Sequence, residues 1–285
     1  MLPSPPRGVP QSATTRPHVG TRPTTLLFAS GKGGVGTSVI TALAALAAAE
    51  RGERVLLVDA SESGAGIQHL FGVHPSHCLW TLTDTRSPVD DALIPITETL
   101  TLVAGGSNGA TAPTSDVDRR TALARLSRIY PRYQLVIFDG GSRLNSITAI
   151  TELVEPTLLL VTSADRLALA ANYALVKAIS ARRPDAIVSV LANRHGDALA
   201  AQACEFLADA CSHFLGRSID IAGAVPDDPC LQAAVGAGMT VHDALEGSPA
   251  AEAVRGLISR FIPSWPTPPR QAAMTGTSLP SRRWS

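Results

Sequence analysis

The sequence of 285 residues has no excess of charge of either sign, because 24 lysine and arginine residues balance 24 aspartate and glutamate residues. A balanced charge gives no strong electrostatic attraction to nucleic acids or anionic lipids. The sequence also lacks an apolar run near the roughly 20 residues that a bilayer-spanning helix needs. Its N-terminus lacks the apolar segment of a secretory signal. We therefore expect a cytoplasmic protein with no strong nucleic-acid signal.

Cysteine is scarce, and the four cysteines form no C-x-x-C pair. Cys204 and Cys211 lie seven residues apart in a segment with helical periodicity, so they share one face of that helix. This pattern favours buried free thiols over a metal cluster. His74 and His77 are close in sequence but have no third ligand in view, so we interpret them as surface residues of a loop.

Lysine is scarcer still, since Lys32 and Lys177 are the only two among 24 basic residues. The composition, 45% hydrophobic and 17% charged, is sufficient for a large α/β domain with an ample core. Both ends of the chain are rich in proline and have no apolar periodicity. We predict a disordered extension at residues 1–23, a folded domain at residues 24–262 and a proline-rich disordered tail at residues 263–285.

Glycine is concentrated where an apolar run, Thr25–Ala29, gives way to an alanine-rich helical pattern. Four glycines occur there within six residues: Gly31, Gly33, Gly34 and Gly36. Glycine permits positive φ and lets backbone amides approach an anion closely. The free amides at the start of a helix favour the same kind of guest. The order of strand, glycine loop and helix therefore predicts a phosphate-binding site.

The common phosphate-loop pattern G-x-x-x-x-G-K-[ST] is matched with one departure. Counted from Gly31, the second glycine is Gly36 and the hydroxyl residue is Ser38, but the lysine position holds Thr37. A different lysine, Lys32, follows the first glycine. The alternative interpretation is a chance glycine-rich turn between a strand and a helix.

Apolar runs that alternate with helical patterns predict the architecture. The run Arg54–Asp59 follows a predicted helix at Ser38–Arg51 and has the continuous apolar character of a strand buried on both faces. Later runs of the same kind end at Asp139, Thr162 and Asn193. The sequence therefore predicts an α/β fold with a doubly wound, mostly parallel sheet flanked by helices.

Two later segments have helical amphipathicity. In the segment Asp118–Ile129 we interpret the arginines as a mostly solvated face: Arg119, Arg120, Arg125 and Arg128. Near the C-terminus a stripe at helical period consists of Ala251, Val254, Leu257, Ile258 and Phe261. We expect this stripe to pack in the core, and the alternative is an amphipathic helix that binds a membrane surface.

The lysine within K-G-G-x-G resembles that of the MinD/ParA family (SIMIBI class) of P-loop ATPases. Asp59, at a strand end, matches the family's first switch, and Asp139, in YQLVIFDGGSR, matches its second. The closing helices are similar in particular to the FlhG/MinD-like branch. The resemblance covers about residues 24–262 and implies a P-loop NTPase fold that binds ATP or ADP with Mg²⁺.

The resemblance also implies roles for single residues. Lys32, Asp59 and Asp139 are the expected catalytic residues, and Ser38, Asp59 and Asp139 are the expected Mg²⁺ ligands. Asn193 is expected to bind the adenine edge, and Lys32 is expected to reach the partner's phosphates in a nucleotide-dependent homodimer. The expected nucleotide-binding residues are Gly31, Lys32, Gly33, Gly34, Val35, Gly36, Thr37, Ser38, Asn193, Arg194, Pro226 and Asp228.

The sequence departs from the family pattern at three positions. Thr37 replaces a lysine, Ser61 replaces the aspartate that positions the attacking water, and Arg143 replaces a switch glycine. Loss of one charge-assisted contact costs about 1.5–3 kcal/mol, or roughly ten- to a hundredfold in affinity. We expect reduced nucleotide affinity and slow or absent hydrolysis. We also expect Arg143 to restore part of the lost charge, and Gly140 and Gly141 to supply the missing switch amide.

Three functions remain open at this point. The first is a MinD/FlhG-like nucleotide-binding regulator of cellular positioning, such as flagellar number or placement, with partner proteins of the flagellar or polar type. The second is a pseudo-ATPase that acts as an interaction scaffold without nucleotide. The third is a ParA-like DNA partitioning factor, which the balanced charge disfavours. Contact with the inner face of the membrane is a further expectation.

Overall fold

A computed structural model describes residues 22–62, 66–107, 112–113, 115–194 and 197–262. The predicted disordered tail at 263–285 lies outside these residues, as does all of the predicted extension at 1–23 except its last two residues.

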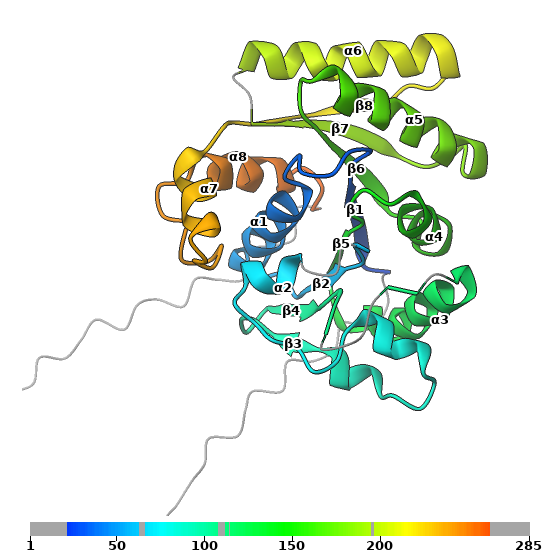
Figure 1. Ribbon diagram of the computed structural model, residues 1–285, viewed down its shortest axis with the longest axis vertical. Coiled ribbons are helices and arrows are strands. Elements are labelled where there is room, and N and C mark those ends of the chain that lie inside the picture. The colour runs from blue at the N-terminus through cyan, green and yellow to red at the C-terminus, as the bar shows by residue number, and fades with distance from the viewer. Residues whose placement is uncertain (1–21, 63–65, 108–111, 114, 195–196, 263–285) are drawn as a thin grey trace, which may run out of the picture.

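The described residues form an eight-stranded sheet in the order β3-β4-β2-β5-β1-β6-β7-β8 (Figure 1). All neighbouring strands are parallel except β3, which pairs antiparallel with β4 at one edge. The central strands are fully apolar or nearly so, which is the pattern of strands buried on both faces. The strands are β1 (Thr24–Ala29), β2 (Val55–Asp59), β3 (Ile94–Pro95), β4 (Leu100–Val103), β5 (Leu135–Asp139), β6 (Thr157–Thr162), β7 (Val188–Asn193) and β8 (Asp220–Val225).

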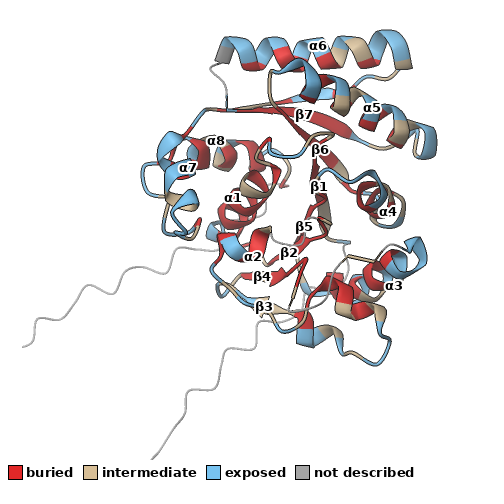
Figure 2. Cartoon of the chain, in the orientation of Figure 1, coloured by how far each residue is buried: buried red, intermediate tan, exposed pale blue. Residues whose placement is uncertain are grey.

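Helices cover both faces of the sheet, and the two faces carry separate apolar clusters. One cluster lies under α3 to α6, and the other under α1, α2, α7 and α8, as the buried helix faces in Figure 2 show. The helices are α1 (Thr37–Glu50), α2 (Ile67–Leu70), α3 (Asp116–Leu126), α4 (Leu144–Val154), α5 (Arg166–Arg182), α6 (Asp197–Leu215), α7 (Pro229–Gly236) and α8 (Pro249–Ile258). Short 3₁₀ helices occupy Leu79–Thr83, Val89–Ala92 and Ser127–Arg132. The doubly wound, mostly parallel sheet that the sequence predicts is thus confirmed.

The C-terminal apolar stripe is part of the core. Helix α8 packs against α1, and Val254 and Ile258 have no exposed surface. The expectation of core packing is confirmed, because the face that a membrane would contact is already buried. In the part of the chain that the structure describes, no helix combines the length and apolarity needed to cross a bilayer.

Two expectations about side chains were wrong. Arg119 of α3 is 3% exposed, and it pairs with Glu62 and Asp116, so it does not belong to a solvated face. Arg125 is half-buried and donates to the Leu82 carbonyl, among others, which ties α3 to a 3₁₀ helix. These arginines look solvent-facing by periodicity, but they are buried or half-buried because segments distant in the sequence, at Glu62 and Leu82, supply polar partners.

The cysteines match the expectation in part. Cys204 and Cys211 are both buried on one face of α6, and Cys78 is buried as well. Cys230, at the start of α7, is exposed, so the expectation of a buried thiol was wrong there. All four are free thiols.

Candidate functional site

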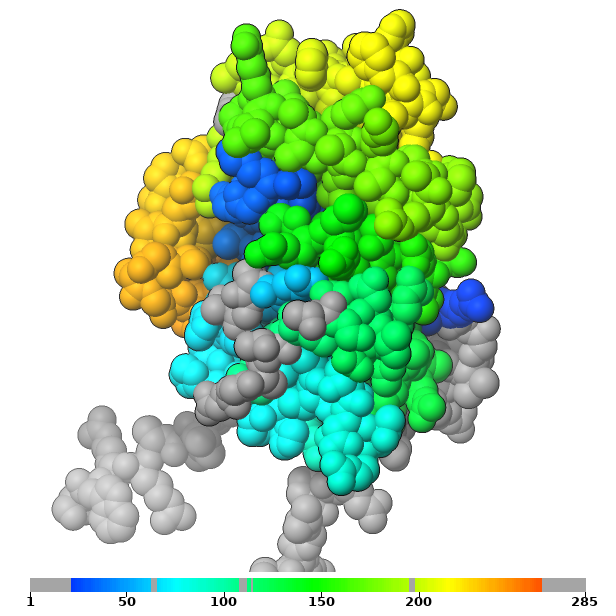
Figure 3. Space-filling view, turned by 45° about the vertical axis from the view of Figure 1, so that its right-hand side comes forward, coloured from blue at the N-terminus to red at the C-terminus, as the bar shows by residue number. Residues whose placement is uncertain are grey.

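The glycine loop connects β1 to α1 at the carboxyl edge of the sheet, and it lies at the surface in Figure 3. Gly34 and Gly36 have φ of 81° and 91°, a region that side chains rarely adopt. Helix α1 begins at Thr37 without a side-chain cap. Within the described chain, the backbone amides of residues 33 to 38 donate to no protein acceptor. Consecutive free amides at a helix start form an anion-binding nest.

Helix α5 fixes the first half of this loop. The Gly31 amide donates to Asn172 Oδ1 at 2.6 Å, and Asn172 Nδ2 donates to the Val161 carbonyl at 3.1 Å. A Cβ on Gly31 would lie 2.2 Å from the backbone carbon of Ala171, so glycine is required there by close approach. The sequence did not single out Asn172, whose one signal is a polar residue within an alanine-rich helical pattern.

Lys32 contacts its own chain rather than the nest. Its Nζ lies 3.1 Å from Asp165 Oδ1. Asp165 also caps α5 by accepting from the Ala168 amide, and it accepts from the Ser163 hydroxyl. These hydrogen bonds and Lys32 hold the pKa of the Asp165 carboxyl well below its usual range. The pair is partly exposed, so it contributes little to folding stability.

Thr37 adds no charge to the loop. Its side chain is 7% exposed, and its hydroxyl donates to Ser30 Oγ at 3.2 Å. Ser30 Oγ in turn donates to the Lys32 carbonyl at 2.8 Å. The two hydroxyls therefore connect the start of α1 to the first half of the loop by hydrogen bonds.

Two carboxylates lie beside the loop at the ends of neighbouring strands. Asp59 of β2 and Asp139 of β5 are register partners, and neither has exposed surface. Burial, together with the charge of Asp59, raises the pKa of Asp139 to about 7, and burial also raises the pKa of Asp59. Two buried carboxylates in register favour either a shared proton or a bound cation.

The oxygens of these carboxylates are not equally engaged. Asp59 accepts from the Ser61 amide and hydroxyl through Oδ1, and from the Ile67 amide through Oδ2. Asp139 Oδ1 accepts from the Gly141 amide at 2.9 Å, whereas its buried Oδ2 has no protein partner within the described residues. The Ser38 hydroxyl lies near Asp139 and lowers its pKa. Hard oxygen ligands of this kind fit Mg²⁺, which retains several waters of its own.

The substitutes expected around the second switch do not face the nest. The Gly140 amide donates to the Phe28 carbonyl at 2.8 Å, and the Gly141 amide is held by Asp139. Arg143 is the exposed N-cap residue of α4, and in the described part of the chain it makes no hydrogen bond or ion pair with its side chain. The loop therefore receives no charge from Arg143 in this conformation.

A polar cluster that the sequence did not reveal joins the two switches. Glu62 follows Ser61 and accepts from the Ser146 hydroxyl at 2.9 Å. Its Oε1 also lies 3.1 Å from Arg119 Nε. The first switch is thus bound to α3 and to α4, the helix that follows the second switch. The local sequence around Glu62 does not indicate that it pairs with Ser146 and Arg119, because both lie far away in the chain.

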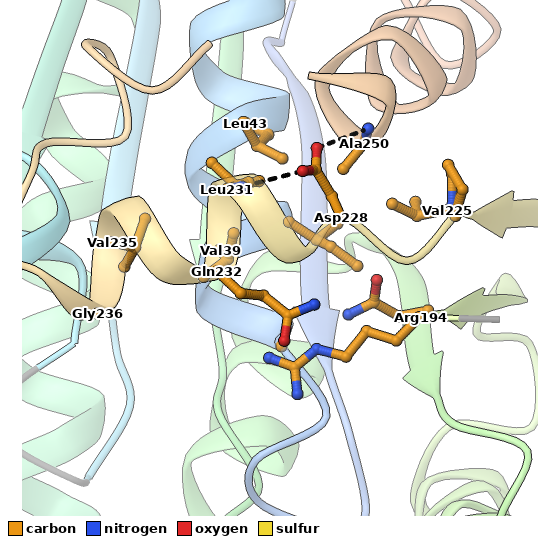
Figure 4. A pocket seen from close by; sticks show the side chains of 14 residues that line it. Val39, Leu43, Arg194, Val225, Asp228, Leu231, Gln232, Val235, Gly236 and Ala250 are labelled. Carbon is orange, nitrogen blue, oxygen red and sulfur yellow. Dashed lines mark hydrogen bonds between the residues drawn. The ribbon is translucent and has the colours of Figure 1, made fainter. Parts of the chain in front are cut away.

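A pocket of about 300 Å³ opens beside the loop, between α1, the end of β7 and α7 (Figure 4). Four of the expected nucleotide-binding residues, Asn193, Arg194, Pro226 and Asp228, line it, next to apolar side chains from α1 and α7. Its size and apolar walls suit a planar base.

The polar groups of this pocket differ in what they can offer a ligand. Asn193 Nδ2 donates to the Val35 carbonyl at 2.7 Å, so the amide oxygen of Asn193 is the group that can accept a hydrogen bond from a ligand. Asp228 accepts from the Leu231 and Ala250 amides, so its carboxylate joins α7 to α8 (Figure 4). Gln232, which the sequence did not suggest, lines the pocket mouth.

The chain is similar to known proteins in sequence and in fold. A family profile described as ParA, NUBPL iron-transfer P-loop NTPase, matches residues 23–110. Over 241 residues the chain is 25% identical to the antiactivator FleN of Pseudomonas aeruginosa, and the match covers 84% of this chain and 85% of FleN.

Solved structures share the fold. A ParA family ATPase from Chlorobium tepidum is 19% identical with a TM-score of 0.66, and the match covers 83% of this chain and 98% of that chain. MinD from Pyrococcus horikoshii, solved with Mg-ADP, is 18% identical with a TM-score of 0.66, covering 83% of this chain and 95% of that chain. These matches show that the chain shares the fold of the ParA and MinD ATPases and that its sequence is similar to FleN over most of both chains.

Proposed function

We propose that this protein binds ATP and ADP with Mg²⁺ and acts as a nucleotide-dependent regulator of cellular positioning. The observation that carries the nucleotide site is the run of six backbone amides, residues 33 to 38, that have no acceptor within the described chain. The polyphosphate lies on these amides, and the base enters the adjacent pocket. Ser38, Asp59 and Asp139 hold the hydrated Mg²⁺, which supplies charge neutralisation between the phosphates and the two carboxylates.

Hydrolysis in this proposal is slow. Thr37 offers a hydroxyl that is already bonded to Ser30, and the Ser61 hydroxyl is bonded to Asp59, so neither supplies a charge or a base to an attacking water. Loss of a water-positioning group lowers turnover by about 10²–10⁴-fold if its role resembles general-base catalysis. The regulatory role is supported by the similarity to FleN over most of both chains. The proposal includes self-association in the nucleotide-bound state.

A scaffold that needs no nucleotide remains the second candidate, favoured by the missing lysine and by the engaged glycine amides of the second switch. A titration of the full chain with ATP, with and without Mg²⁺, separates the two. Saturable, Mg²⁺-dependent binding supports the nucleotide site. Absence of saturable binding at millimolar ATP would favour the scaffold.

Gly36→Ala is a sharp test of the nest. A Cβ at this position would lie 2.3 Å from Asn193 Nδ2, and φ is 91°, so we expect the variant to lose ATP binding. Gly52→Ala is the matched control, since its φ is 87° but nothing lies within 4 Å of the added Cβ. Retained binding in Gly36→Ala would show that the loop is not the phosphate site.

Restoring the family residues tests the proposed cause of slow hydrolysis. The double variant Thr37→Lys/Ser61→Asp should hydrolyse ATP faster than the native protein, because it regains both the cation and the water-positioning carboxylate. Phosphate release under single-turnover conditions measures this. Unchanged turnover in a variant that binds ATP would show that these two positions do not limit the reaction.

A further inference from the structure

Two cationic side chains of the described residues bear on the glycine loop: Lys32 belongs to the loop itself, and Arg194 contacts it from the end of β7. Lys32 is bound to Asp165, on the side of α5. Arg194 lies on the pocket side, where its Nη1 is 3.5 Å from the Gly34 carbonyl. Arg194 forms no ion pair with the described residues, and it is exposed. Its charge is therefore free for a ligand.

The backbone holds Arg194 in an uncommon conformation. Its φ is 64°, in the left-handed region that non-glycine residues seldom occupy. Its amide donates to the Val225 carbonyl at 3.0 Å, and the preceding Asn193 is buried and bonded to the Val35 carbonyl. Backbone strain of this kind persists where surrounding contacts fix it, and such positions concentrate at ligand sites. In this conformation the Arg194 side chain reaches the Gly34 carbonyl of the loop.

The guanidinium lies between the base pocket and the amide nest. Its Nε is 3.8 Å from the position that a Cβ on Gly36 would take, and the side chain lines the pocket mouth near Gln232 (Figure 4). The Asp228 carboxylate lines the same pocket, but it accepts from the Leu231 amide and the Ser248 hydroxyl, and within the described residues it forms no ion pair with Arg194. A guanidinium beside six free amides makes a strongly anion-selective region.

We propose that Arg194 is the phosphate-binding cation of this site and takes the place of the lysine that is missing at position 37. The assignment rests on the proposed nucleotide site and names the residue that supplies its charge. A guanidinium binds two phosphate oxygens at once through its fork of donors. Its long contact with the Gly34 carbonyl is weak, so phosphate oxygens replace it readily. With the base in the pocket, Arg194 would be within reach of the phosphates nearest the ribose.

The test compares Arg194→Gln, Arg194→Lys and the native full chain in calorimetric titrations with MgADP, tripolyphosphate and adenosine. We expect Arg194→Gln to lower the affinity for MgADP and for tripolyphosphate by about ten- to a hundredfold. The affinity for adenosine should fall by less than about twofold. Arg194→Lys should lose less, because it keeps the charge. Both variants keep a non-glycine residue at the strained position, so thermal melting should change little.

Arg143→Gln is the matched control, because Arg143 is an exposed arginine at the same sheet edge without a contact to the loop. Recovery of tripolyphosphate binding by Thr37→Lys in the Arg194→Gln background would support the exchange of one cation for the other. Unchanged MgADP affinity in Arg194→Gln, or an equal loss for adenosine, would overturn the assignment while leaving the nucleotide site in place. Absence of nucleotide binding by the native protein would remove the proposed function and this assignment together.

Discussion

At the scale of single residues, the buried carboxyl pair determines how the site responds to protons. Burial beside Asp59 raises the pKa of Asp139 to about 7, so the folded chain retains a proton that the unfolded chain releases near its ordinary pKa of 3.8. Between these two values the unfolded state binds fewer protons than the folded state as the pH rises. The contribution of Asp139 to stability is therefore fully present below about pH 3.8, and it is lost as the pH rises towards 7.

Asp139→Asn removes this ionisation and keeps an oxygen that accepts from the Gly141 amide. We expect the variant, without Mg²⁺, to be more stable than the native protein at about pH 8, by at least about 1 kcal/mol, and to show a flatter pH profile. Urea denaturation at about pH 5 and pH 8 measures both. Parallel stability profiles of the two proteins would contradict the raised pKa.

Glu62, like Asp139, is a largely buried carboxylate whose substitution should change the stability of the fold. Its side chain is 19% exposed, it accepts a hydrogen bond from the Ser146 hydroxyl, and it forms an ion pair with Arg119. Glu62→Gln weakens the partner of a buried guanidinium, so we expect a loss of about 1–3 kcal/mol, less than a full uncompensated charge because Asp116 remains.

Hydrogen exchange separates this effect from a general loss of stability. Amides of α3 and of the first turn of α4 should exchange faster in Glu62→Gln, while those of α6 keep their protection. Equal acceleration throughout the sheet would show that Glu62 does not act as a local tie between the switches.

At the scale of elements, the fit between the loop and α5 leaves no room for a methyl group. Gly31→Ala places its Cβ 2.2 Å from the Ala171 backbone, so the loop or the helix must shift, at about 1–3 kcal/mol or more. Gly256→Ala, within α8 and with nothing near the added Cβ, should instead stabilise by about 0.5–1 kcal/mol. Thermal unfolding of both variants checks the opposite signs, and a neutral Gly31→Ala would contradict the close packing.

The elements themselves were largely predictable, because local patterns decide them. Continuous apolar runs predicted β2 and β5, and the glycines predicted the loop, since these signals lie within a few neighbouring residues. Asn172 was missed because its partner Gly31 is 141 residues away. Arg119 was misplaced for the same reason, as helical periodicity cannot reveal Glu62 on another segment.

At the scale of the whole molecule, a bound nucleotide should stabilise the chain as one unit. The nest, the carboxylates and the base pocket belong to β1, β2, β5, β7 and α7, so ligand binding draws together both halves of the sheet. At a ligand concentration of about 100 times Kd, the linkage amounts to about 2.7 kcal/mol. We expect MgADP to raise the Tm by several degrees, and adenosine to raise it much less.

Lys32 offers a second consequence at this scale, because any interaction that recruits it from outside must first separate it from Asp165. The ion pair is accessible to solvent on both sides, with 37% and 44% of the side chains exposed. Mobile counter-ions screen such a pair efficiently at physiological ionic strength. The lysine is therefore held reversibly, and its release depends on the surrounding electrolyte as well as on whatever competes for it.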